Sequence, residues 1–97
     1  MHEIRFEGDN AKAALNERKH GVSFEEAQTV FYDEHAIEFF DPDHSEREER
    51  FIMLGTSLKL RILVVCHCVR EAESVIRIIS ARKAIHREAE HYRREIA

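Results

Sequence analysis

The sequence has one proline, three glycines, two cysteines and no tryptophan among its 97 residues. So few chain breakers exclude a Pro/Gly-rich disordered segment and a collagen-like repeat. The two cysteines, Cys66 and Cys68, are too few for a disulfide framework, and on a strand they would share one face. We interpret both as reduced core residues.

Long apolar runs are also missing. None approaches the roughly 20 residues that span a bilayer, and the opening segment MHEIRFEGDN contains no apolar signal core. Hydrophobic residues make up 43% of the sequence, which is typical of a globular domain. We therefore expect one domain over residues 1–97, in the cytoplasm and with no membrane contact.

Charge is unevenly distributed along the chain. Residues 1–58 contain 6 basic and 14 acidic side chains, whereas residues 59–97 contain 9 basic and 5 acidic ones. The net charge of −4 is thus made of −8 in the first part and +4 in the second. An acidic half suits a basic partner, and a cationic half suits a polyanion.

Local patterns predict two helices near the N-terminus, after an edge strand over residues 2–7. Asp9 and Gly21 suit the N-cap and C′ positions of the first helix, and Ser23 with Glu26 forms a capping box for the second. In the first helix, a common stripe is expected for Ala11, Ala14, Leu15 and Arg18.

The rest of the chain predicts four strands and a final helix. A strand over residues 36–40 precedes a polar turn at Pro42, and the segments RFIMLGTS, RILVVCHCV and SVIRIISA have the composition of successive antiparallel strands. The final helix has Ile85, Ala89, Tyr92 and Ile96 on one stripe. The expected fold is α+β with element order β-α-α-β-β-β-β-α, an antiparallel meander with helices mainly on one face. The open face is where we expect a functional site.

Arg77 lies inside an apolar strand, which makes it a candidate site residue. Strict alternation places Arg77 on one face and Arg82 on the other, with apolar residues on both. A partly buried guanidinium needs an anion, either a neighbouring carboxylate or a phosphate. The sequence leaves both possibilities open.

Arg82 and Lys83 lie at the expected start of the last helix. Cations in a first helical turn are disfavoured by about 0.3–1 kcal/mol each. Their position makes sense if an anion also binds there, because helix N-termini present free N–H groups. The alternative is that Glu88 or the acidic loop neutralises them.

The acidic loop DPDHSEREER contains His44, Glu49 and Arg50, of which Glu49 and Arg50 adjoin a strand start. Its spacing matches neither a calcium loop nor a zinc signature, so we interpret it as solvated and predict no metal or other cofactor. Lys19 and His20 close the first helix. His20 is either a helix C-cap or a group that titrates near neutrality and can transfer protons.

Taken together, the segments FEGDNAKAALNERKHGVSFEEAQTVFYD, DPDHSEREERFIMLG and IRIISARKAIHREAEHY resemble the BrnT family of toxins from type II toxin–antitoxin modules. The resemblance implies a fold similar to RelE-type ribonucleases, cleavage of cellular RNA and inhibition of translation. It also implies neutralisation by a BrnA-like antitoxin with a ribbon-helix-helix domain, through which the complex, expected to be a higher-order assembly, would contact operator DNA.

Metal-free RNA cleavage needs a base, an acid and cations around the phosphate. Our hypothesis assigns phosphate or RNA binding to Lys19, Arg50, Arg77, Arg82 and Lys83. Candidates for catalysis are His20, His44, Glu49, Arg77 and Tyr92. The main alternative is a non-catalytic module that binds a DNA-binding partner. Direct DNA binding ranks lower, because the net charge is negative and no recognition motif is present.

Overall fold

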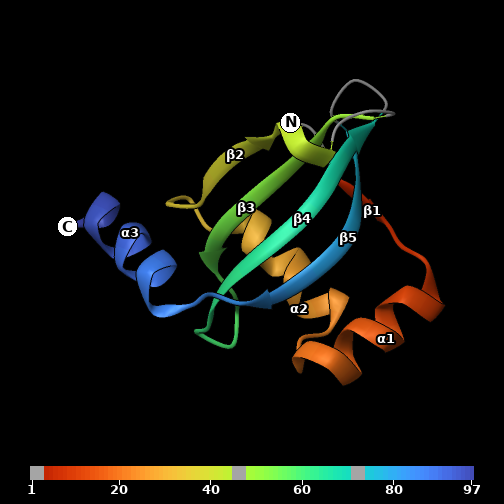
Figure 1. Cartoon of the computed structure of the whole chain (residues 1–97), viewed down its shortest axis with the longest axis horizontal. Coiled ribbons are helices and arrows are strands. Elements are labelled where there is room, and N and C mark those ends of the chain that lie inside the picture. Colours follow the sequence, from red (N-terminus) through yellow and green to blue (C-terminus); the bar gives the residue numbers. More distant parts are fainter. Residues whose placement is uncertain (1–3, 45–47, 71–73) are drawn as a thin grey trace.

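The computed structural model describes residues 4–44, 48–70 and 74–97. The predicted element order is confirmed (Figure 1). The strands are β1 (Arg5–Glu7), β2 (Ile37–Asp41), β3 (Arg50–Thr56), β4 (Ile62–Arg70) and β5 (Val75–Lys83). The α-helices are α1 (Asn10–His20), α2 (Phe24–Thr29) and α3 (His86–Ile96), and short 3₁₀ turns occupy Val30–Tyr32 and Pro42–His44.

The strands form one sheet in the order β1-β5-β4-β3-β2. From β2 to β5 it is the expected antiparallel meander. The first strand instead pairs in parallel with β5, with Phe6 opposite Ile76, so the sheet is mixed. The chain leaves β1, forms α1 and α2, and enters the meander at the far edge, which leaves β1 beside the last strand.

Two helices cover one face of the sheet, which we call the helix face. In the view of Figure 1, α2 lies behind the strands and α1 lies next to it, below β5. The main core lies between these layers and contains Val22, Phe24, Ala27, Val30, Leu63, Val65, Ile76, Ile78 and Ala81. The last helix packs on the opposite face at one end of the sheet, where Tyr92 contacts a cluster with Leu54 and Val64. Among the described residues, no other helix packs on this face, which is called the open face below.

The predicted stripe of α1 is wrong. Leu15 is 58% exposed, and the buried residue of this helix is Asn16. The Asn16 amide donates to the carbonyls of Ala81 (2.8 Å) and Val22 (2.9 Å) and accepts from the Ala81 N–H (3.1 Å). Since β1 pairs with β5 only as far as Glu7, the polar side chain of a helix supplies backbone hydrogen bonds further along β5.

A β-bulge in β5 changes the face that its arginines occupy. Cys66 lies opposite Ser80 and His67 lies opposite Ile78, so Ile79 is an extra residue in β5. Strict alternation predicted opposite faces for Arg77 and Arg82, and this is wrong. The extra residue places both of them on the open face.

Both predicted N-caps are confirmed. The Asp9 carboxylate accepts from the N–H groups of Ala11 and Lys12, and the Ser23 hydroxyl accepts from the Glu26 N–H. No helix in the described ranges is long and apolar enough to cross a membrane.

Candidate functional site

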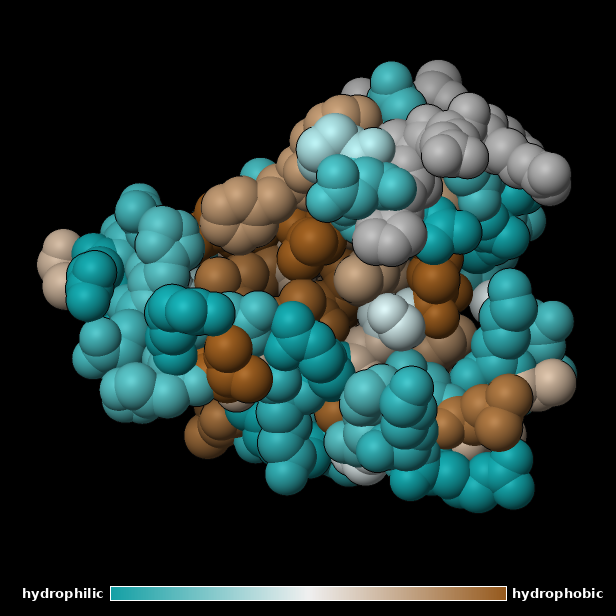
Figure 2. Space-filling model, viewed as in Figure 1, coloured by the Kyte–Doolittle hydropathy of each residue, from teal (hydrophilic) through white to brown (hydrophobic). Residues whose placement is uncertain are grey.

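The open face is a grid of side chains from four adjacent strands. Its rows are set by the strand register, with neighbouring strands about 4.8 Å apart. Figure 2 shows its apolar centre bordered by hydrophilic residues. The three rows are Asp41, Arg50, Cys68 and Arg77; then Phe39, Ile52, Cys66 and Ser80; then Ile37, Leu54, Val64 and Arg82.

Arg77 is held at the open face by a carboxylate. Its guanidinium makes an ion pair with Glu48 and lies 3.8 Å from the Cys68 sulfur. Glu48 also lies 3.3 Å from Arg70. Hydrogen bonds with Cys68 and Arg70, together with the positive charges of Arg77 and Arg70, lower the pKa of Glu48. Of the two anions that the sequence left open for Arg77, the structure supplies the carboxylate, and the Arg77 side chain remains 30% exposed.

Arg82 has an equivalent partner at the start of α3. Its two terminal nitrogens donate to the two carboxylate oxygens of Glu88, at 2.8 and 2.9 Å. Glu88 also accepts from the Ile85 N–H at 2.9 Å. The hydrogen bonds with Arg82 lower the pKa of Glu88 and raise that of Arg82. The alternative that Glu88 neutralises Arg82 is therefore the one the structure shows, and the Arg82 side chain is still 41% exposed.

Arg50 joins this set, whereas Lys83 does not. Arg50 lies opposite Cys68, and Cys68 lies opposite Arg77, so the two arginines flank one thiol in a single row. Lys83 is exposed and lies opposite Leu63, a residue of the helix-face core. It points away from the open face.

The candidates for proton transfer are spread over the molecule. Glu49 is exposed and precedes Arg50 at the start of β3. His44 ends the 3₁₀ turn that follows β2, and its side chain lies outside the described part of the structure. Lys19 and His20 end α1, which packs over the helix face. The structure does not bring these two residues to the arginines.

Tyr92 has a structural role. It is 4% exposed, and its hydroxyl hydrogen-bonds the Asp33 carboxylate and the Thr56 hydroxyl. Burial and the bond with Asp33 raise its pKa. The geometry therefore gives no support to Tyr92 as the general acid, because its proton is already shared inside the α3 contact.

Sequence analysis missed several residues of this face. Glu48 was grouped with a solvated loop, and Phe39 and His91 were not named as site residues. The alternation of IEFFD, which places Phe39 opposite Ile52, would have identified Phe39. The three-residue spacing of Glu88 and His91 would have placed His91 above the same surface.

Cys66 and Cys68 share one face, as alternation predicted. Both belong to the open face, and His67 between them belongs to the helix face. Within the described ranges, no three side chains of the metal-binding types lie together.

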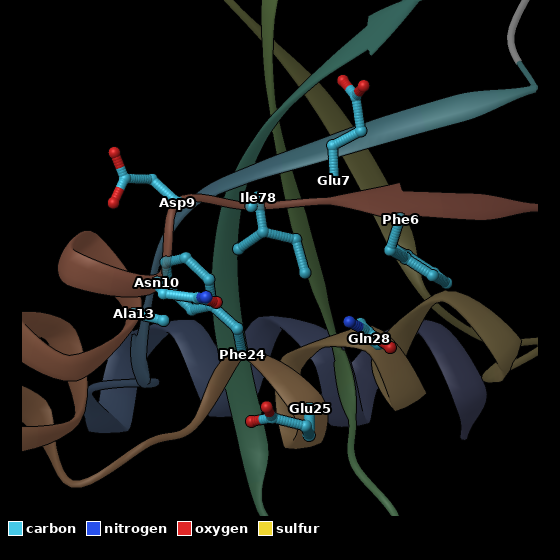
Figure 3. Close-up of a pocket in the computed structure, with 10 residues that line it drawn as sticks. Phe6, Glu7, Asp9, Asn10, Ala13, Phe24, Glu25, Gln28 and Ile78 are labelled. Atoms are coloured by element: carbon cyan, nitrogen blue, oxygen red, sulfur yellow. The ribbon is translucent and has the colours of Figure 1, made fainter.

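A separate pocket lies on the helix face, between β1, α1 and α2. It measures about 230 Å³ and is lined by apolar Phe6, Phe24 and Ile78 among other residues. Figure 3 shows Glu7 and Asp9 directed away from its centre. Its charged lining residues are carboxylates, which repel phosphate, so the open face is the better place for an anionic ligand.

The fold and the open face define a small α+β protein in which carboxylates hold arginines on the open face of the sheet. A family model described as the ribonuclease toxin BrnT of a type II toxin–antitoxin system matches residues 9–88, and the chain belongs to this family. The resemblance inferred from the sequence is thereby confirmed. As a ribonuclease toxin, the protein has RNA as its substrate and an antitoxin as its partner.

A solved structure supports the fold. The crystal structure of the Brucella abortus ribonuclease toxin BrnT matches with a TM-score of 0.62 and 22% sequence identity, over 89% of this chain and 100% of that one. No curated protein matches the sequence.

Proposed function

We propose that the protein cleaves RNA by metal-independent general acid–base catalysis on the open face, and thereby inhibits translation. Arg50, Arg77 and Arg82 would bind the phosphates. The observation that carries this proposal is the bulge at Ile79, which places Arg77 and Arg82 on one face with Arg50. Three guanidinium groups around an apolar floor suit the charge that develops on a phosphate during cleavage.

The carboxylates keep these arginines in place before RNA arrives. Glu48 holds Arg77 and Glu88 holds Arg82, so each guanidinium is oriented by an ion pair and still partly exposed. A phosphate then competes with a partly solvated carboxylate for each guanidinium. Arg77 and Arg82 are therefore oriented before RNA binds.

We assign proton transfer to His44 and Glu49. Both belong to the connection between β2 and β3 that enters the row of Arg50. An imidazole and a carboxylate are the usual groups for taking the 2′-hydroxyl proton and protonating the leaving oxygen. His20 ends α1 on the helix face, and the Tyr92 hydroxyl is buried against Asp33 and Thr56, so we assign proton transfer to neither.

The partner in this proposal is a basic antitoxin of the ribbon-helix-helix class, similar to BrnA. The acidic first part of the chain, with a net charge of −8, provides electrostatic complementarity for a basic segment. Operator DNA would be contacted only through the antitoxin, in a higher-order complex within the cytoplasm.

The test compares RNA cleavage in EDTA by the parent, Arg77→Ala and Arg82→Ala, with Arg94→Ala as the matched control. Arg94 lies on α3 with its side chain 76% exposed and pairs with Glu90, so its loss removes a cation without touching the open face. Each open-face substitution is expected to lower the cleavage rate about 100-fold, because it removes one preorganised donor.

Circular dichroism must show that all four proteins are folded. Equal cleavage by folded parent and open-face variants would contradict the site. Intact RNA with every protein, including in the presence of translating ribosomes, would favour the non-catalytic binding module.

A further inference from the structure

A groove runs along the boundary between α3 and the open face. It is called the α3 groove here, has a volume of about 330 Å³, and is lined by Phe39, Ile52, Leu54, Val64, Arg87, Glu88 and His91. The floor is aliphatic and comes from β3 and β4. The walls are the aromatic side chain of an edge strand and the first two turns of a helix.

Two aromatic side chains line the groove, one from β2 and one from α3. The ring centroids of Phe39 and His91 lie 5.9 Å apart at an interplanar angle of 42°. Phe39 is 40% exposed although it is a large apolar residue, and His91 is also exposed. An aliphatic floor with exposed ring faces is suited to a planar heterocycle, which stacks on rings and covers apolar surface.

The groove is continuous with the position of Arg82. Glu88 lines the groove and at the same time binds both terminal nitrogens of Arg82. Val64, in the groove floor, lies directly opposite Arg82 in the sheet. A ligand that combines a phosphate with a planar base would therefore fill both places at once. At the rim, the Glu88 carboxylate can accept from a base edge and the Arg87 guanidinium can donate to one.

We propose that the α3 groove is a base-binding subsite, which takes one nucleobase of the RNA beside the phosphate that Arg82 binds. This inference rests on the proposed function and adds a determinant of substrate choice to it. The ring stack supplies affinity for any base, and the polar rim discriminates among bases.

The test uses a short single-stranded 2′-O-methyl RNA, which cannot be cleaved at the 2′-oxygen. The fluorescent base 2-aminopurine is placed at one position at a time, because stacking on an aromatic ring quenches it. The parent is expected to quench the fluorophore at one position. Phe39→Leu, which keeps apolar volume but removes the ring, is expected to abolish that quench and to weaken binding about tenfold.

The matched control is Phe40→Leu. Phe40 is the next residue of β2, is 52% exposed, and faces the helix side opposite Phe51. It should behave as the parent does. On α3, His91→Ala should weaken binding and His91→Phe should restore the quench. His91 is exposed, so these two variants test the groove even if Phe39→Leu is unstable.

The outcomes separate this inference from the function beneath it. If the parent cleaves RNA in EDTA but quenches no position preferentially, and Phe39→Leu binds like Phe40→Leu, the subsite is wrong and the ribonuclease proposal stands. If the parent neither binds the oligonucleotide nor cleaves RNA, both are wrong. If Phe39→Leu loses affinity for the purified antitoxin but not for RNA, the groove is a protein contact and the subsite is again wrong.

Discussion

His67 is an ionisable side chain enclosed among aromatic rings. It is fully buried. Its ring centroid lies 4.8 Å from that of Phe31, which is edge-on, and 6.0 Å from that of Phe51, which is stacked. The Glu38 carboxylate lies 3.6 Å from Nε2. Burial lowers the pKa of His67, against the opposite effects of the Val65 carbonyl and Glu38. Alternation along β4 accounts for the face that His67 occupies, but no local pattern predicts that residues far apart in the sequence would exclude water from it.

This burial predicts a loss of stability in weak acid. The folded state keeps His67 neutral, whereas the unfolded chain binds a proton with a pKa of about 6.5. Protonation of His67 should therefore leave the free energy of unfolding unchanged above that pH. Below it, the free energy of unfolding should decrease by at most about 1.4 kcal/mol per pH unit. His67→Phe, which retains the ring contacts, should flatten the decline in Tm between pH 7 and pH 5.

The control for that experiment is His86→Gln, since the side chain of His86 is 86% exposed. It should leave the decline of the parent unchanged. Identical pH profiles for His67→Phe and the parent would show that His67 does not resist protonation.

At the scale of elements, the turn between β3 and β4 is fixed to α2 by a buried ion pair. Glu26 has a side chain 2% exposed and accepts from Arg61 Nε at 2.9 Å and from the Ser57 hydroxyl at 2.7 Å. Arg61 also donates to the Gly21 carbonyl at 3.1 Å. These bonds, led by the one from Arg61, lower the pKa of Glu26.

Removing only one partner of this ion pair should lower the free energy of unfolding more than replacing both. Arg61→Ala leaves a buried carboxylate uncompensated and is expected to lower the free energy of unfolding by about 3–5 kcal/mol. The double variant Glu26→Gln/Arg61→Ala should lose less than the two single variants combined. A double-mutant cycle by urea unfolding at pH 7 measures this coupling.

Strict additivity of the two substitutions would contradict the coupling. Acid provides a second check with a definite sign. Glu26 contributes stability above its ordinary pKa of 4.5 and loses it as the pH falls through the lower pKa of the folded state. The difference between parent and Arg61→Ala should therefore shrink towards pH 3.

The same pair shows where prediction of elements from sequence stops. The order of helices and strands and the caps at Asp9 and Ser23 depend on neighbouring residues, and all were predicted correctly. Glu26 was assigned to a capping box on the same local logic. Its side chain instead bonds Arg61, 35 positions along the chain, and no local pattern encodes that contact.

At the scale of the molecule, a negatively charged protein gathers cations on one face. The net charge is −4, yet Arg50, Arg77 and Arg82 share the open face. Three phosphate contacts with single-stranded RNA predict a slope of about −2 for log K against log salt concentration. Fluorescence anisotropy with uncleavable RNA at several KCl concentrations measures it.

Arg77→Ala should reduce the magnitude of that slope by about 0.7 and Arg94→Ala should not change it. A slope near zero would exclude phosphate as the ligand of the open face. The uncovered face itself was predicted from the sequence, because two consecutive helices leave the other side of a meander free. That α3 packs on this other side was not predicted, since its apolar stripe does not specify which face it covers.

The extra residue in β5 determines both which side chains of this strand enter the core and which face the opposite side. Ile76, Ile78 and Ala81 reach the core at intervals of two and then three residues, and Arg77 and Arg82 are carried to the opposite side by the same uneven count. Without Ile79, residues before the bulge would exchange sides: Arg77 would enter the apolar interior and two isoleucines would face water. Folding and the placement of these arginines therefore cannot be altered independently in this strand, because one count of residues sets both.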